Sequence, residues 1–136
     1  MLTKDSIEKL LREADELLMK GDLIQTSEKY YKVAEEVIKI LSFRNSIKTV
    51  LKVKSLGHWN SKMYFDALDE LERIYPGIKS LWKSAWILHV EGFHEVALSQ
   101  ESVNFLKSDV EKIVKLLYLK RNFEFSYSFI SYSLNF

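Results

Sequence analysis

Apolar residues recur every three or four positions along most of the chain, which is the spacing of one face of an α-helix. Between Ser6 and Leu41 this pattern runs through two segments that meet at Gly21 and Asp22. The glycine suits a left-handed residue after the first helix, and the aspartate can cap the second helix. The two apolar faces are Ile7, Leu10, Leu11, Ala14, Leu17 and Leu18, then Leu23, Ser27, Tyr30, Ala34, Val37 and Leu41. A connection this short predicts an antiparallel helical hairpin.

The same spacing predicts three more helices after the hairpin. The first is capped at Asn60 or Ser61 and stops before Pro76, because the residue before a proline disfavours helical backbone. The second has Pro76 in its first turn, and the third runs from about Glu101 to Arg121. Their apolar faces are Phe65, Leu68, Leu71 and Ile74; Ile78, Leu81, Trp82, Ala85, Leu88 and His89; and Val103, Leu106, Val110, Ile113, Val114 and Leu117. We therefore expect an all-α antiparallel bundle of about five helices.

Two segments do not show the helical pattern clearly. Residues 42–54 fit a short helix through Ile47, Val50 and Leu51, but their β-branched residues also suit an extended segment. In residues 122–136 the apolar side chains alternate and then shift phase, which is typical of a strand with a bulge. Such a tail could pair with a second copy, pack as an apolar arm, or be loosely ordered. We therefore predict a helical bundle over residues 1–121 and an irregular or extended aromatic tail over residues 122–136.

Composition restricts the class of protein. A chain of 136 residues with 47% hydrophobic and 29% charged residues is typical of one globular domain with a substantial core. The absence of cysteine excludes disulfides, thiolate nucleophiles and zinc–thiolate sites. No apolar run reaches the ~18–20 residues that cross a bilayer, and the N-terminus lacks an apolar signal stretch, so we expect a cytoplasmic protein. Three Trp, seven Tyr and eight Phe are more aromatic area than a small bundle easily hides, which predicts a homodimer.

The net charge of +1 hides an uneven distribution of charge. Residues 37–65 contain no Asp or Glu, although several basic residues lie there. A local positive field of this kind can attract phosphates even when the net charge is near zero. The candidates for binding phosphate or nucleic acid are Arg44, Lys48, Lys52, Lys54, His58, Trp59 and Lys62. The alternative is a solvated basic face that neighbouring acidic helices balance.

The candidate catalytic groups lie shortly before the last predicted helix. His89 and His94 are separated by about 140° around an α-helix, so they can face one ligand only if the helix is distorted at Gly92. The Glu91-x-x-His94 spacing occurs in di-iron bundles, but those sites need a second such motif and two further glutamates. We therefore predict no metal site and no cofactor. His89, Glu91 and His94 are the catalytic candidates, and the alternative is that His89 and its aromatic neighbours simply pack in the core.

Three stretches of the chain carry a resemblance to a known family: ADELLMKGDLIQTSEKYYKVAEEVIKIL, WKSAWILHVEGFHE and ESVNFLKSDVEKIV. They are similar to the archaeal PaREP family, which is named for a Pyrobaculum repeat. The helical bundle of that family is similar to the HEPN superfamily, the nucleotide-binding fold of higher eukaryotes and prokaryotes. The resemblance covers about Ser6 to Arg121, and it implies a HEPN-like bundle.

The resemblance also implies two kinds of function. Relatives in the HEPN superfamily cleave RNA through an Arg-x(4–6)-His motif at a dimer cleft, or accompany a nucleotidyltransferase, often as toxin–antitoxin pairs. No arginine lies at that distance before His58, His89 or His94. We therefore predict a non-catalytic binding or assembly module that works as a homodimer or with a nucleotidyltransferase-like partner. The alternative is a ribonuclease or nucleotide-binding enzyme in which His89 and His94 act across a dimer cleft.

Overall fold

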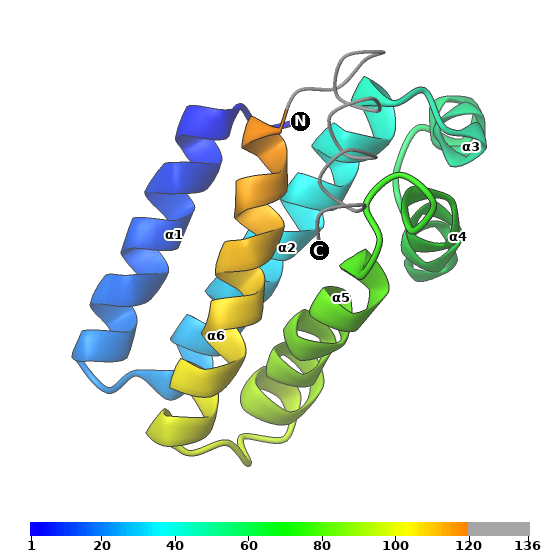
Figure 1. Cartoon of the computed structure of the whole chain (residues 1–136). Coiled ribbons are helices and arrows are strands. Elements are labelled where there is room, and N and C mark those ends of the chain that lie inside the picture. The colour runs from blue at the N-terminus through cyan, green and yellow to red at the C-terminus, as the bar shows by residue number, and fades with distance from the viewer. Residues whose placement is uncertain (120–136) are drawn as a thin grey trace.

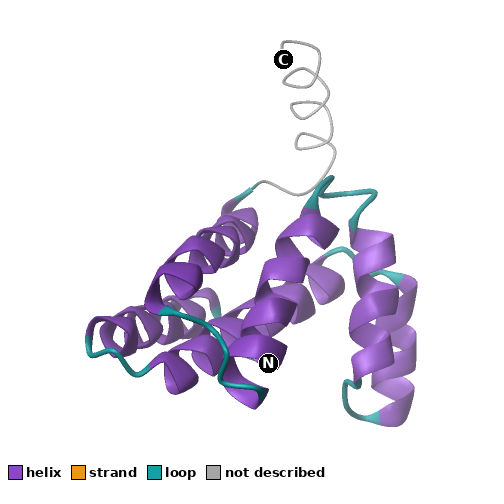
Figure 2. Ribbon diagram, turned by 90° about the horizontal axis from the view of Figure 1, so that it is seen from below, coloured by secondary structure: helices purple, strands orange, loops and turns teal. Residues whose placement is uncertain are grey.

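The computed structural model describes residues 1–119, which form six α-helices and contain no strand (Figure 1, Figure 2). These helices are α1 (Lys4–Met19), α2 (Leu23–Arg44), α3 (Lys48–Leu56), α4 (Ser61–Leu71), α5 (Ile78–Ile87) and α6 (Gln100–Lys115). A π-helical segment, η1 (Leu88–His94), continues α5, and a short 3₁₀ turn, η2 (Leu116–Tyr118), follows α6. The prediction of an all-α bundle is confirmed. The predicted tail, residues 122–136, lies outside the described residues.

Helix α2 is the centre of the molecule. It contacts every other helix of the described chain, and its inward face, which includes Val33, Val37 and Leu41, is fully buried. Helices α1, α2, α5 and α6 form the main bundle, whereas α3 and α4 pack together at one side of it (Figure 1). Among residues 1–119, no helix is long and apolar enough to cross a membrane.

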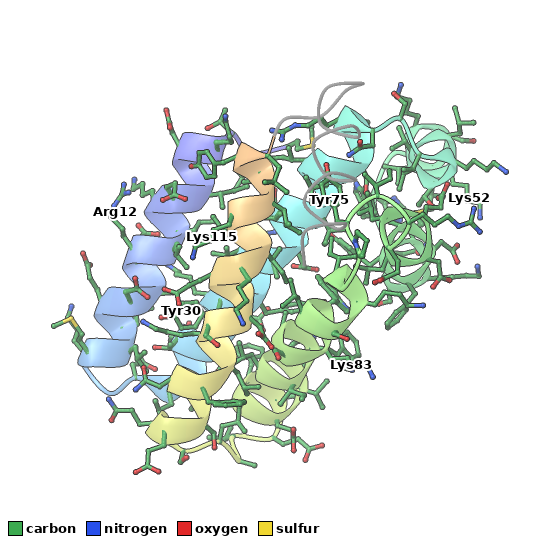
Figure 3. All side chains as sticks on the ribbon, in the orientation of Figure 1. Arg12, Tyr30, Lys52, Tyr75, Lys83 and Lys115 are labelled. Carbon is green, nitrogen blue, oxygen red and sulfur yellow. The ribbon has the colours of Figure 1, made fainter. Side chains whose placement is uncertain are left out.

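The hairpin of α1 and α2 forms as the sequence predicts. Gly21 adopts a left-handed conformation with φ of 80°, and the Asp22 carboxylate accepts a hydrogen bond from the backbone N–H of Gln25 at 3.1 Å. Tyr30 reaches from α2 toward α1 (Figure 3), where its hydroxyl donates a hydrogen bond to Asp15. The capping residues at the turn and the buried apolar faces of the two helices thus both favour the hairpin.

The ambiguous segment is a helix, α3, and a distant glutamate caps it. Ile47 precedes α3 and offers no side-chain cap. Instead, the Glu70 carboxylate from α4 accepts hydrogen bonds from the backbone N–H groups of Lys48 and Thr49, at 2.7 and 3.0 Å. The carboxylate of Glu72 does the same for the start of α5. A negative charge is favourable at a helix N-terminus, so the end of α4 stabilises two neighbouring helices.

Two details of the predicted helices are wrong. Pro76 does not lie in the first turn of a helix, because α5 begins at Ile78 after Gly77, whose φ is 96°. Phe65 does not face the core: it is 48% exposed, since the buried side of α4 is centred on its neighbour Tyr64 instead. Phe65 is available for contacts on the outside of the bundle.

Candidate functional site

The segment after α5 approaches α2 more closely than any residue other than glycine allows. A Cβ atom added at Gly92 would lie 2.3 Å from the Ser27 Oγ and 2.6 Å from the Ser27 Cβ. The chain is wound here as a π-helix, in which residues five apart are paired along the helix axis. The distortion that the sequence required at Gly92 is therefore present in η1.

This winding brings the two histidines together. The Nε2 atoms of His89 and His94 lie 3.1 Å apart, and their ring planes are nearly perpendicular, at 82°. The Nδ1 of His89 lies 2.9 Å from Oε2 of Glu28 in α2. A carboxylate can only accept, so Nδ1 of His89 donates to Glu28; with both rings neutral, Nε2 of His94 then donates to Nε2 of His89. Glu28, His89 and His94 form one hydrogen-bonded chain that leads from α2 to the surface.

Aromatic rings extend from this chain across three elements. We call Phe65, Trp86, His89 and Phe93 the aromatic stripe: neighbouring ring centroids lie 5.7, 5.5 and 6.3 Å apart in that order. Phe65 is exposed, and Trp86 and Phe93 are partly buried. Tyr31 stacks beneath His89 at 4.1 Å, which joins the stripe to the core. The stripe is a partly exposed apolar surface that runs over α4, α5 and η1.

The carboxylate of Glu35 lies beside Tyr31 and Tyr64 in a partly buried environment. Burial raises the pKa of Glu35 above its usual range, although the charges of nearby lysines act in the opposite direction. Burial, together with the negative charge of Glu35, also raises the pKa of Tyr31 and Tyr64 far above the ordinary tyrosine value. These phenols therefore stay protonated, and this face of the bundle carries no phenolate.

Only some of the basic residues that are candidates for binding phosphate lie close together in the structure. A groove of about 370 Å³ between α3 and α4 is lined by Lys48, Thr49, Lys52, Asp66, Asp69, Glu70 and Arg73. The ammonium groups of Lys52 and Lys62 both pair with Asp66, at 3.4 and 2.9 Å. Lys52 extends outward at the edge of the molecule (Figure 3). Two lysines of the stretch without acids, Lys52 and Lys62, are therefore paired with an acid of α4.

The other basic candidates lie elsewhere. The Arg44 guanidinium donates to the carbonyl oxygen of Leu117 at 2.7 Å, so it ties the end of α2 to η2. Lys54 lies over a phenylalanine ring of α2, at 6.0 Å from the centroid. Trp59 stacks on Tyr64 at 4.9 Å and packs against the core, while His58 is exposed in the turn after α3. The structure does not bring these residues into the groove that Lys48 and Lys52 line.

The model of the archaeal PaREP1/PaREP8 family matches residues 2–114. The chain belongs to this family. A crystal structure of a protein from Sulfolobus solfataricus is 46% identical and has a TM-score of 0.77; the match covers 85% of this chain and 94% of that chain. A solution structure of the same structural-genomics target is 49% identical, has a TM-score of 0.73, and covers 82% of this chain and 87% of that chain. No curated protein matches the chain.

Two site residues of this PaREP1/PaREP8 protein were not found by reasoning from the sequence. Glu28 and Tyr31 bond and stack with His89, but they lie in α2, far from it in the chain. The one available signal was their spacing of three residues, which places both on the same side of that helix. Among residues 1–119, no group of three or more His, Asp or Glu side chains converges so that it could hold a metal ion.

Proposed function

We propose that this PaREP1/PaREP8 protein is a non-catalytic assembly module that forms a homodimer through the aromatic stripe. The observation that carries the proposal is the partial exposure of three large rings, Phe65, Trp86 and Phe93, on one continuous surface. Contiguous exposed apolar surface of this kind typically marks a protein interface. Aromatic residues are also the side chains that contribute most binding energy at interfaces.

The charges around the stripe favour a second copy as the occupant. The Glu28 carboxylate contacts His89 of the stripe from α2, and the exposed Lys83 lies one turn before Trp86 on α5. A twofold axis places the same surface of both copies face to face. Because both signs of charge flank the rings, such an arrangement can set lysines against glutamates. A nucleotidyltransferase-like or toxin–antitoxin partner, which the family resemblance suggests, would compete for the same stripe.

Light scattering or sedimentation equilibrium tests the proposal. We expect twice the chain mass of 16.0 kDa at micromolar concentrations. Phe65→Ala should weaken the dimer by about 1,000-fold, since both copies lose an aromatic anchor and each anchor contributes about 2 kcal/mol. Phe105→Ala is the matched control, because Phe105 is 77% exposed on α6. A monomeric mass throughout, or equal dissociation in both variants, would contradict the proposal.

A second candidate function is general acid–base catalysis, and the Glu28–His89–His94 chain favours it. Glu28 orients His89, and the exposed His94 completes a route for a proton to the surface. Paired imidazoles in this arrangement can act on RNA or a nucleotide as base and acid. Incubation with single-stranded and structured RNA tests this candidate: cleavage should disappear in His94→Ala and persist in His58→Ala. Intact RNA after prolonged incubation would exclude these substrates.

Phosphate binding by the basic candidates is a further proposal, and it now centres on the lysines near the α3–α4 groove. Asp66 competes with any phosphate for Lys52 and Lys62, so we expect weak, sequence-tolerant binding. Three phosphate contacts would give a slope of about −2 to −3 in log affinity against log salt concentration. Lys52→Glu with Lys62→Glu should abolish binding to RNA or DNA, whereas Lys9→Glu on α1 should not. Binding that survives the first pair of changes would remove the groove from consideration.

A further inference from the structure

The imidazole pair in η1 has the spacing of two ligands of one metal ion. Their Nε2 atoms lie 3.1 Å apart. A metal ion about 2.0–2.1 Å from each nitrogen, with the ligand angles of octahedral or tetrahedral sites, holds two nitrogens roughly 2.9–3.4 Å apart. The π-helical winding and the contact of Gly92 with Ser27 set this spacing within a single turn. The two nitrogens are therefore already close enough for one ion.

Glu28 supplies the second feature of a metal site. A histidine that binds a metal almost always donates its other ring N–H to a carboxylate, a carbonyl or water, which fixes its tautomer and orientation. The Nδ1 of His89 makes this contact with Glu28 at 2.9 Å, and Tyr31 stacks on the ring at 4.1 Å. The lone pair on the Nε2 atom of His89 is thereby directed away from α2 and toward His94. Because His94 is exposed, its ring is free to turn toward a shared ion.

We propose that His89 and His94 bind a divalent transition-metal ion that prefers imidazole ligands, such as Zn²⁺ or Ni²⁺, through their Nε2 atoms. Glu28 is the positioning residue. Water completes the coordination, since no third acidic or histidine side chain of residues 1–119 joins the pair. His94 moves its proton from Nε2 to Nδ1, so a neutral pair binds the ion without losing a proton. Mg²⁺ does not bind here, because it requires oxygen ligands.

This site differs from the di-iron type of site that we did not expect from the sequence. A carboxylate-bridged site would use Glu91 with His94, three residues apart on a regular α-helix. The proposed site uses His89 with His94, which only the π-helix brings together. Both ligands come from one chain, so the site is complete without a second copy, although His89 also belongs to the aromatic stripe.

Isothermal titration of the untagged protein with ZnCl₂ or NiCl₂ near neutral pH tests the proposal. We expect saturable binding of the transition metals and none of Mg²⁺. His94→Ala should abolish this binding, and Glu28→Gln should weaken it by about 10–100-fold, the usual effect of losing such a carboxylate. His58→Ala is the matched control, because His58 is also an exposed histidine. Imidazole ¹⁵N chemical shifts should place the metal on Nε2 of both histidines.

Thermal unfolding of the metal-free proteins shows whether the variants are folded. His94 is exposed, so His94→Ala should keep the metal-free thermal unfolding midpoint of the wild type. Added Zn²⁺ should raise that midpoint in the wild type and in His58→Ala, but not in His94→Ala. Absence of saturable binding in the wild type overturns the proposal. Binding that persists in His94→Ala, or equal binding of Mg²⁺, overturns it as well.

Discussion

Replacing Gly92 by alanine tests the contact that holds η1 against α2. The new Cβ would lie 2.3 Å from Oγ and 2.6 Å from Cβ of Ser27, and 3.1 Å from Cδ1 of Leu98. Ser27 is fully buried, so it cannot move away without moving α2. Forcing atoms into a packed interior costs about 1–3 kcal/mol. Without the clash, alanine would instead stabilise the protein by up to about 1 kcal/mol, because it restricts the unfolded chain.

Two changes at Ser27 provide the matched test of this reasoning. Ser27→Gly removes both clashing atoms, whereas Ser27→Ala removes Oγ and leaves Cβ in place. We expect Gly92→Ala to lower the free energy of unfolding in the wild type, to lower it less in the Ser27→Ala background, and to be neutral or stabilising in the Ser27→Gly background. Urea unfolding followed by circular dichroism gives these values as double-mutant cycles. The same penalty in every background, or no penalty in the wild type, would refute the steric explanation.

Three further predictions concern carboxylates and phenols. Glu70→Ala should cost about 1 kcal/mol in urea unfolding, because it removes the acceptor at the start of α3; an unchanged midpoint would contradict this capping role. Burial alone would raise the pKa of Glu36, but the hydrogen bond and charge of Lys39 outweigh it and lower the pKa. The stability that Glu36 contributes is therefore present above its unfolded value of 4.5 and is lost as pH falls below it. The difference in unfolding free energy between wild type and Glu36→Gln should shrink in acid, and a constant difference would count against the ion pair. Burial raises the pKa of Tyr30, Tyr31 and Tyr64 far above 10.0, so an alkaline absorbance titration should ionise them only as the protein unfolds.

The sequence predicts well those elements whose signals are local. The hairpin of α1 and α2 follows from its two apolar faces and from Gly21 and Asp22 at the turn. Helix α3 could not be decided in this way, because its N-terminus is capped by Glu70, which belongs to another helix. Intrinsic preference is weak in such a short helix, so the distant carboxylate settles the structure.

The candidate site shows the same limit more clearly. The spacing of His89 and His94 indicates that the two rings can meet only if the helix is distorted at Gly92. It does not indicate whether that distortion occurs. That depends on the contact of Gly92 with Ser27, which only the packing of η1 on α2 creates. The basic segment shows the opposite case: its lack of acids along the chain is offset by Asp66, which the fold places beside Lys52. Charge patterns along a sequence describe a surface only when the neighbouring helix is known.

The two glutamates at the end of α4 have a consequence for how the protein opens. Glu70 holds the first amides of α3, and Glu72 holds those of α5, so unwinding the end of α4 releases both helices at once. Helices α3 and α4 also lie at one side of the main bundle (Figure 1). Amide hydrogen exchange should therefore show α3, α4 and the first turn of α5 opening as one cooperative unit, while the centre of α2 stays protected until global unfolding.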